Sequence, residues 1–446
     1  MSASIAKRWR ELSGSNHWNG LIKPLDNDMR IYLTHYGDLV EATYTTFITQ
    51  SISPFAGSSR FSMPNLLSGA GLTGRANPLM KYKITKYLYA MSDISLPGSW
   101  MVSPLPGSSW SKNSNWIGYV AVTTDEGKGL LGRRDIVVAF RGTIMISEWM
   151  KDFDARRTSA ATIYKNGSAL LHHGFYSIYT ASDPGTTYNK QSARDQVLAE
   201  VNRLVAQYKA EDLSVTVIGH SLGAALSTIC AADIVVNAAK AAKPYPVTAF
   251  PYASPRCGDS GWKTFVDGLG AATNSSALNA GDQGLRILRI VNRPDLVTQS
   301  PPPIGFTHVG QIFQVDATFS NVLNLIPFNP AVAHDMESSY LHGIQISKGS
   351  LVEERLRMDL PPRDIALINK HQNALKPEFN VPPNWWTAQN KGMTQGANGN
   401  WTMTAGNWIL QGRHLSEEGD EIGGQEHETV EKKDYTEEDQ GASSST

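Results

Sequence analysis

The sequence lacks any apolar run long enough to cross a membrane, which excludes a transmembrane helix. It has only two cysteines, Cys230 and Cys257, a count found in both secreted and intracellular proteins. Residues 1–12 lack the apolar core of a signal peptide and the long Ser/Arg-rich composition of a transit peptide. We therefore expect a soluble, cytoplasmic protein, in which Cys230 is a small buried side chain.

The sequence also lacks a cluster of basic residues of the kind that binds nucleic acid. The net charge of −1 conceals an asymmetry, because residues 415–446 alone carry eleven acidic side chains and two lysines. The rest of the chain is mildly basic, which suits an anionic lipid surface and equally suits ordinary solubility. We expect one domain over residues 1–414 and a disordered acidic tail over residues 415–446, which has few apolar side chains.

Strand and helix patterns alternate from residue 135 to residue 300, which predicts an α/β fold with a mostly parallel sheet and crossover helices. The helix predicted over residues 192–208 has one apolar face and begins with a capping box formed by Ser192 and Asp195. Residues 51–79 are rich in serine, glycine and proline and should be irregular. The other predicted segments are helices over 4–12, 24–47 and 224–239, and strands over 83–89, 117–123, 135–140, 213–218, 245–250 and 285–291.

The segment Gly219-His220-Ser221-Leu222-Gly223 has the G-x-S-x-G pattern and lies between a predicted strand and a predicted helix. A sharp strand-to-helix turn forces its serine into strained backbone angles, and the flanking glycines remove side chains that would clash. We therefore expect Ser221 to be an exposed nucleophile, with the backbone N–H of Leu222 facing a developing oxyanion. The alternative is a tight turn with an inert serine.

A serine nucleophile needs a base and a carboxylate, which follow it in the order Asp or Glu and then His in hydrolases of this topology. Asp295 directly follows the strand predicted over 285–291, at the sheet edge where such sites form. Asp316 is the second candidate. His334 follows a proline-marked segment and is expected in a loop, while His308 and His342 remain alternative bases.

Thr143 follows the strand predicted over 135–140 and is a candidate second oxyanion donor. The alternative is that this threonine caps the next helix. Residues 144–150 are apolar and follow directly, so they form either a lid that opens on lipid or the first turn of a packed helix.

Four tryptophans occur near the C-terminal end of the expected domain. They allow two interpretations, aromatic packing of a C-terminal extension onto the core or an anchor at a lipid–water interface. These residues are Trp385, Trp386, Trp401 and Trp408.

Several blocks together resemble class 3 lipases, and more closely the plant class II phospholipases A1. The blocks that resemble class 3 lipases are residues 138–143 (VAFRGT), 219–226 (GHSLGAAL) and 292–297 (NRPDLV). The blocks that resemble the plant group are residues 9–14, 18–21, 253–256, 334–337, 340–343, 363–370 and 385–386. The resemblance extends over roughly residues 8–410, which leaves out the acidic tail.

The resemblance implies an α/β-hydrolase fold with N- and C-terminal extensions, and hydrolysis of the sn-1 ester of phospholipids. It implies Ser221 as nucleophile, Asp295 as orienting acid, His334 as base and Thr143 as oxyanion donor. Related fungal lipases carry their base in an Ala-His segment followed by a tyrosine, which favours His334 over His342.

The implied chemistry is two-step acyl transfer, which needs no metal or cofactor. The expected partners are a phospholipid substrate and, transiently, a membrane surface. The alternatives are a broader galactolipid or triacylglycerol lipase and a catalytically silent lipase-like scaffold. A scaffold has no need for the serine, aspartate, histidine and threonine that this chain retains.

Overall fold

The computed structural model describes residues 2–50, 53–73, 77–92, 114–143, 156–165, 167–238, 245–271, 284–324, 329–348, 363–386 and 392–403. These residues belong to one compact unit, Met1–Met403. The second unit, Thr404–Thr446, lies outside the described residues, so the domain end at residue 414 and the disordered tail remain predictions. Within the described ranges, no helix has both the length and the apolarity to cross a membrane.

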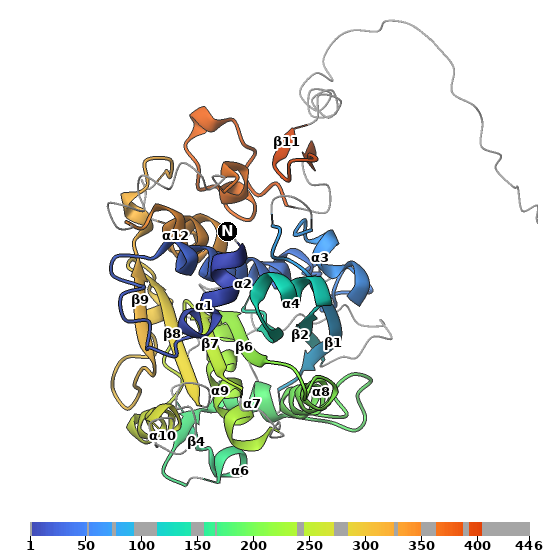
Figure 1. Ribbon diagram of the computed structural model, residues 1–446, viewed down its shortest axis with the longest axis vertical. Helices are drawn as coiled ribbons and strands as arrows, with labels where there is room; N and C mark the ends of the chain where they lie inside the picture. Colours follow the sequence, from blue (N-terminus) through green and yellow to red (C-terminus); the bar gives the residue numbers. More distant parts are fainter. Residues whose placement is uncertain are drawn as a thin grey trace, which may run out of the picture. The chain divides into compact units, whose positions relative to one another are not determined.

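The centre of the unit is a seven-stranded sheet with the order β1-β2-β3-β6-β7-β8-β9 (Figure 1). The pairs β1–β2 and β2–β3 are antiparallel, whereas β3, β6, β7, β8 and β9 run parallel to one another. This arrangement confirms the predicted mostly parallel sheet. The strands are Tyr82–Ala90 (β1), Asn115–Thr123 (β2), Arg134–Phe140 (β3), Leu213–His220 (β6), Val247–Tyr252 (β7), Leu285–Asn292 (β8) and Gln311–Val315 (β9).

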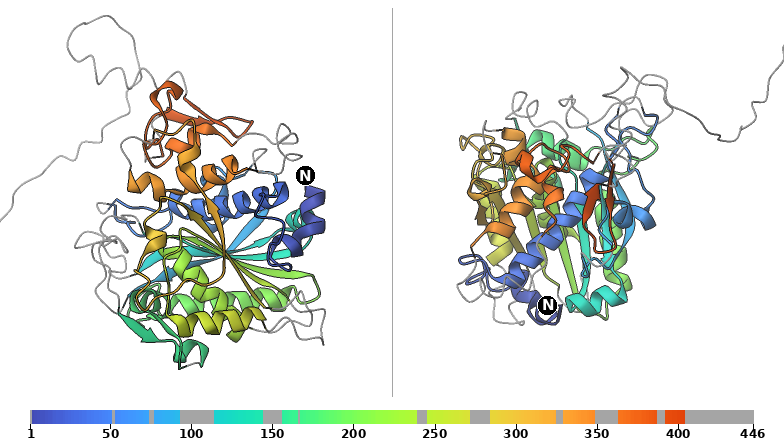
Figure 2. Two further views of the ribbon diagram at one scale, coloured as in Figure 1. Left: turned by 90° about the vertical axis from the view of Figure 1, so that its left-hand side faces the viewer. Right: turned by 90° about the horizontal axis from the view of Figure 1, so that it is seen from above.

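Helices cover both faces of the sheet, with α2 on one side and α8, α9 and α10 on the other (Figure 2). Side chains of β6 point to both faces of the sheet. Val215 and Val217 pack with α8 and α9 on one face, and Ile218 packs with α2 on the other. Every residue of β6 is buried, as expected for a central parallel strand. The main helices are Ser2–Leu12 (α1), Asn27–Thr45 (α2), Asp125–Leu131 (α4), His173–Thr180 (α7), Ala193–Gln207 (α8), Leu222–Asn237 (α9), Ser260–Ala271 (α10) and His342–Ile346 (α12).

The smaller elements lie mainly in the connections and in the C-terminal part of the unit. The short helices are Leu66–Gly69 (α3), Ala161–Tyr164 (α6) and Pro330–His334 (α11), with a π-helix at Met336–Leu341 and 3-10 turns at Met63–Asn65, Val297–Gln299, Ala317–Phe319, Ile365–Asn369 and Pro377–Phe379. The short strands pair as Arg157–Ser159 (β4) with Leu170–His172 (β5), and Met393–Gln395 (β10) with Trp401–Met403 (β11).

Most predicted elements are confirmed, although several helices, among them α4, α7 and α10, were not predicted. The helix predicted from residue 24 begins at Asn27, because the Asp26 side chain accepts the Met29 N–H and caps the helix there. The irregular stretch 51–79 contains the single helical turn α3. Strand β9 was not predicted, because it is a five-residue edge strand with partly exposed polar side chains and no long apolar run.

The described C-terminal tryptophans form an aromatic cluster. Trp385 is buried, and its ring lies 4.8 Å from Trp401 and 5.7 Å from Trp386 between centroids. Trp386 donates its indole N–H to the carbonyl of Thr45, at the end of α2. These contacts support packing onto the core for the three residues, while Trp408 lies outside the described residues.

Candidate active site

Ser221 occupies the sharp turn between β6 and α9. Its backbone angles, φ 60° and ψ −124°, lie where an L-residue is strained, as predicted for the nucleophile position. A Cβ on Gly219 would lie 2.1 Å from the Gly223 carbonyl oxygen, so the turn requires a glycine there. One expectation is wrong: Ser221 is only 1% exposed, because the neighbouring segments enclose it.

Gly223→Ala is expected to destabilise the protein by about 1–3 kcal/mol or more. The new Cβ would lie 2.3 Å from the Phe140 carbonyl oxygen and 2.7 Å from that of Arg141, and backbone atoms yield less readily than a flexible side chain. Thermal unfolding would measure the loss. The matched control is Gly268→Ala in α10, whose Cβ would meet nothing within 4 Å and which should retain or raise the melting temperature. Equal melting temperatures for both variants would contradict the argument.

His334 and Asp295 form a buried pair, each 1% exposed. Nδ1 of His334 lies 2.8 Å from Oδ2 of Asp295, and Nδ1–H donates a hydrogen bond to this carboxylate oxygen. Asp295 follows β8, as predicted, and Oδ1 accepts the backbone N–H of Val297 at 2.9 Å. Nε2 of His334 is buried and has no hydrogen-bond partner among the described residues. The second nitrogen is therefore left to accept a proton.

The structure differs from the sequence prediction in how His334 is held. The residue was expected in a loop, but it is the last residue of the one-turn helix α11. Asn329 caps this helix by accepting the Ala331 N–H, and Pro330 supplies a favourable first residue.

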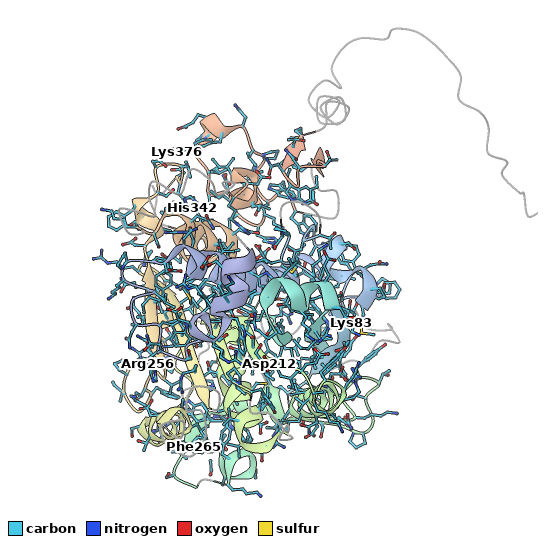
Figure 3. The ribbon with its side chains drawn as sticks, in the orientation of Figure 1. Lys83, Asp212, Arg256, Phe265, His342 and Lys376 are labelled. Carbon is cyan, nitrogen blue, oxygen red and sulfur yellow. The ribbon has the colours of Figure 1, made fainter. Side chains whose placement is uncertain are left out.

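The alternative acid and bases lie in other environments. Asp316 accepts hydrogen bonds from Thr318 and so caps the turn after β9. His308 donates Nε2–H to the Thr298 carbonyl at 2.8 Å, and burial lowers its pKa to about 3. His342, which begins α12 (Figure 3), lies 2.7 Å from the Ser320 hydroxyl. None of these three forms a described contact with the His334–Asp295 pair.

Thr143 and Leu222 lie at the same edge of the sheet. They follow β3 and β6, which are parallel neighbours with Phe140 opposite Gly219. Thr143 is 4% exposed, and its hydroxyl oxygen has no hydrogen-bond partner among the described residues. An unpaired donor fits an oxyanion site. The segment that Thr143 would cap begins at residue 144, outside the described residues, so the capping alternative remains untested. The proposed lid, residues 144–150, lies outside the described residues.

Tyr340 is a site residue whose role the sequence did not reveal. Its hydroxyl donates to Oδ2 of Asp295 at 2.5 Å, so this oxygen accepts hydrogen bonds from both Tyr340 and His334. The six-residue spacing from His334 was visible in the sequence. Its meaning was not, because the π-helix Met336–Leu341 sets the direction of the tyrosine side chain.

A buried charged cluster lies next to the segment that carries His334. Arg363 contacts Asp38 at 2.7 Å and Glu337 at 2.5 Å, which connects the C-terminal part of the unit to α2 and the π-helix. Lys370 lies 3.3 Å from Glu41 and 3.8 Å from Glu337. Burial raises the pKa of Glu337 to about 7 despite the adjacent Arg363. Burial opposes ionisation of Glu41 too, but His371 and Lys370 outweigh it and lower the pKa of Glu41 to about 2.

These shifts predict a decline in stability above pH 4.5. Glu337 holds its proton more tightly in the folded state, so its contribution to stability is lost as the pH rises from its ordinary pKa of 4.5 to about 7. The contribution of Glu41 has the opposite sign and is lost as the pH falls from 4.5 to about 2. The free energy of unfolding should therefore decline less in Glu337→Gln than in the wild type between pH 5 and 7.5, by up to about 3 kcal/mol.

Melting temperatures across that pH range would measure this effect. The control is Glu126→Gln, since the Glu126 side chain is 63% exposed and should leave the slope unchanged. A Glu337→Gln variant with the wild-type slope would contradict the assignment.

A cavity of about 520 Å³ lies apart from this site, lined by residues of α2, α12, Ile365–Asn369 and the β10–β11 hairpin. Ser221, Asp295 and His334 are not among its lining residues, so we place the candidate active site by its chemistry and not by this cavity. No group of three or more potential metal-ligating side chains occurs in the described ranges.

Comparisons with known proteins identify the family of this chain. The sequence model of the family Lipase (class 3) matches residues 137–304. The chain is 43% identical to phospholipase A1-IIgamma of Arabidopsis thaliana over 410 residues, which is 90% of this chain and 94% of the relative. It is 46% identical to phospholipase A1-II 1 of Oryza sativa subsp. indica over 403 residues, or 90% of this chain and 96% of the relative.

Among solved structures, the nonglycosylated LIP2 lipase of Yarrowia lipolytica matches with 19% identity and a TM-score of 0.42, covering 66% of this chain and 81% of that one. Lipase II from Rhizopus niveus matches with 17% identity and a TM-score of 0.41, covering 69% of this chain and 94% of that one. The family is shown by the sequence relatives, which match along nearly their whole length. The chain belongs to the class 3 lipase family, in the group of the plant phospholipases A1-II.

Proposed function

We propose that the protein is a phospholipase A1, a serine hydrolase that releases the sn-1 fatty acid from phospholipids. The observation that carries the chemistry is the buried His334–Asp295 pair, with its free Nε2, together with the strained Ser221. The phospholipid substrate and the sn-1 position come from relatives that are named phospholipase A1-II.

In the proposed mechanism, Nε2 of His334 takes the proton of Ser221, and the serine oxygen attacks the ester carbonyl. Asp295 stabilises the imidazolium that forms, through the 2.8 Å contact to Nδ1. The Leu222 N–H and Thr143 hold the oxyanion, and His334 then protonates the departing lysophospholipid. Water activated by His334 finally releases the fatty acid from Ser221.

The substrate is tested with a phosphatidylcholine that carries different acyl chains at sn-1 and sn-2. We expect the protein to release the sn-1 acid first, and Ser221→Ala to release neither. Early release of the sn-2 acid would contradict the assigned position. Faster hydrolysis of a galactolipid or a triacylglycerol, assayed in parallel, would favour the broader lipase. Absence of hydrolysis on all three lipids would favour the silent scaffold.

Entry of lipid requires motion, because Ser221 is 1% exposed. Residues 144–150 follow Thr143 directly, and we propose them as the lid. Trp149→Ala should then lower activity on vesicles by about tenfold or more while changing activity on a short soluble ester little. A core-packed Trp149 would instead cause equal losses on both substrates and a lower melting temperature. Parallel assays and a melting curve distinguish these outcomes.

We further propose a cytoplasmic location with transient contact to membranes. The mildly basic body is compatible with attraction to an anionic lipid surface. Fractionation of cells that express the full chain would test the location, and recovery mainly in a secreted fraction would contradict it.

A further inference from the structure

His220, the residue before the nucleophile, bridges two parts of the site. Its ring is buried, with 3% exposure, and its Nε2 lies 2.7 Å from the backbone carbonyl oxygen of His334. Its Nδ1 lies 2.7 Å from the hydroxyl of Tyr44, on α2. The His220 and His334 rings are 4.4 Å apart between centroids. Side chains from two distant segments therefore meet at the residue that adjoins Ser221.

The hydrogen bonds determine which nitrogen of His220 carries the proton. A carbonyl oxygen only accepts hydrogen bonds, so Nε2–H of His220 donates to the His334 carbonyl. Nδ1 of His220 therefore accepts a hydrogen bond from the Tyr44 hydroxyl. Burial, and then the nearby His334, lower the pKa of His220 well below its ordinary value, which keeps the ring neutral. A neutral His220 does not repel the imidazolium that His334 becomes during the reaction.

The His334 carbonyl needs this external donor because α11 ends at His334. In a longer helix its partner would be the N–H of Ser338, but that group donates to Oδ1 of Asp335 at 2.8 Å. The preceding carbonyl, of Ala333, accepts the side-chain amide of Asn292 at 2.7 Å. Side chains at the ends of β6 and β8 thus hold the backbone of the base-carrying turn.

From this geometry we infer that His220 is a positioning residue, which holds His334 at the distance from Ser221 that proton transfer requires. The inference rests on the proposed function. Because His220 is covalently adjacent to Ser221, its bond to His334 relates the base directly to the nucleophile. Tyr44 maintains the donor nitrogen of His220 in the correct orientation. The Tyr44 hydroxyl also lies near the nucleophile, because a Cβ on Gly142 would be 2.0 Å from that hydroxyl and 3.0 Å from Ser221 Cβ.

The test uses the full-length protein and a short soluble ester, with turnover normalised to the serines that a fluorophosphonate labels at completion. His220→Leu should lower kcat per labelled serine about 100-fold and leave KM within about twofold, because a misplacement of about 1 Å has effects of this size. Tyr44→Phe should have a smaller effect of the same kind. The rate of fluorophosphonate labelling should also fall, more in His220→Leu than in Tyr44→Phe, since that reaction also needs Ser221 activated by His334.

Two conservative variants keep the test decisive if His220→Leu folds poorly. His220→Gln places an amide N–H near the position of Nε2 and should recover at least tenfold of the lost kcat, whereas the shorter His220→Asn should not. His342→Gln is the control for loss of a partly buried histidine elsewhere. Wild-type kcat per labelled serine in folded His220→Leu, or equal kcat in the Gln and Asn variants, would overturn the inference.

The experiment distinguishes failure of the positioning role of His220 from failure of the proposed function. A wild-type protein without Ser221-dependent hydrolysis contradicts the function itself. An active wild-type protein whose His220 variants lose only melting temperature, with full turnover per labelled serine, contradicts the positioning role alone.

Discussion

Ser221→Ala is expected to lower ester hydrolysis by about 10⁶-fold while the protein retains its fold. The loss follows from removal of the attacking oxygen, which Nε2 of His334 would otherwise activate. Alanine must adopt the same φ of 60° as the serine, so the strain of the turn is nearly unchanged. Hydrolysis of a short soluble ester, fluorophosphonate labelling and a melting curve together measure the effect.

The matched control is Ser227→Ala, in helix α9, which begins directly after Ser221. Ser227 is also fully buried, but its hydroxyl donates to the Ala224 carbonyl, so its loss should leave hydrolysis and labelling near wild type. Near-normal hydrolysis by a folded Ser221→Ala protein would contradict the whole catalytic assignment. Loss of activity in both variants would point to a general defect of α9.

The second large effect is expected for His334→Ala, which should match Ser221→Ala within about tenfold. Removal of the ring leaves Ser221 without a base and leaves the buried Asp295 with Tyr340 and Val297 as its remaining donors. The same soluble ester, assayed across pH, would measure the loss. A residual rate proportional to hydroxide concentration would show that solution base replaces the missing imidazole.

His308→Ala and His342→Ala serve as controls for this experiment. Both histidines are partly buried and hydrogen-bonded, to Thr298 and Ser320 respectively, and neither contacts Asp295 in the described structure. We expect both variants to retain substantial activity. If His342→Ala lost activity as completely as His334→Ala in a folded protein, the base would have to be reassigned.

Local patterns in the sequence were sufficient to predict most strands of the central sheet. The apolar runs of β3, β6, β7 and β8 are nearly continuous because both faces of a central parallel strand are buried. Edge strand β9 escaped prediction because it is only five residues long and its two glutamines interrupt any apolar run. The family itself was recognised from sequence blocks, and the comparisons confirm it.

The candidate site was predicted less completely, because several of its groups act through contacts between distant segments. Ser221 and Asp295 each follow a strand end, a relation that the sequence displays directly. The choice of His334 among three histidines depended on the family resemblance, since its spacing from Asp295 has no local meaning. The 2.8 Å contact between His334 and Asp295 supports that choice on geometric grounds.

The sequence by itself determined the strand-to-helix turn at Ser221, because a glycine-flanked serine between β6 and α9 is a local feature of adjacent residues. Only the tertiary structure decided which polar groups meet there. Tyr44 reaches His220 across 176 positions of sequence, and His220 reaches His334 across 114. Packing of α2 and of the turn after α11 against the sheet creates these contacts, and the requirement that buried polar groups be hydrogen-bonded selects their partners.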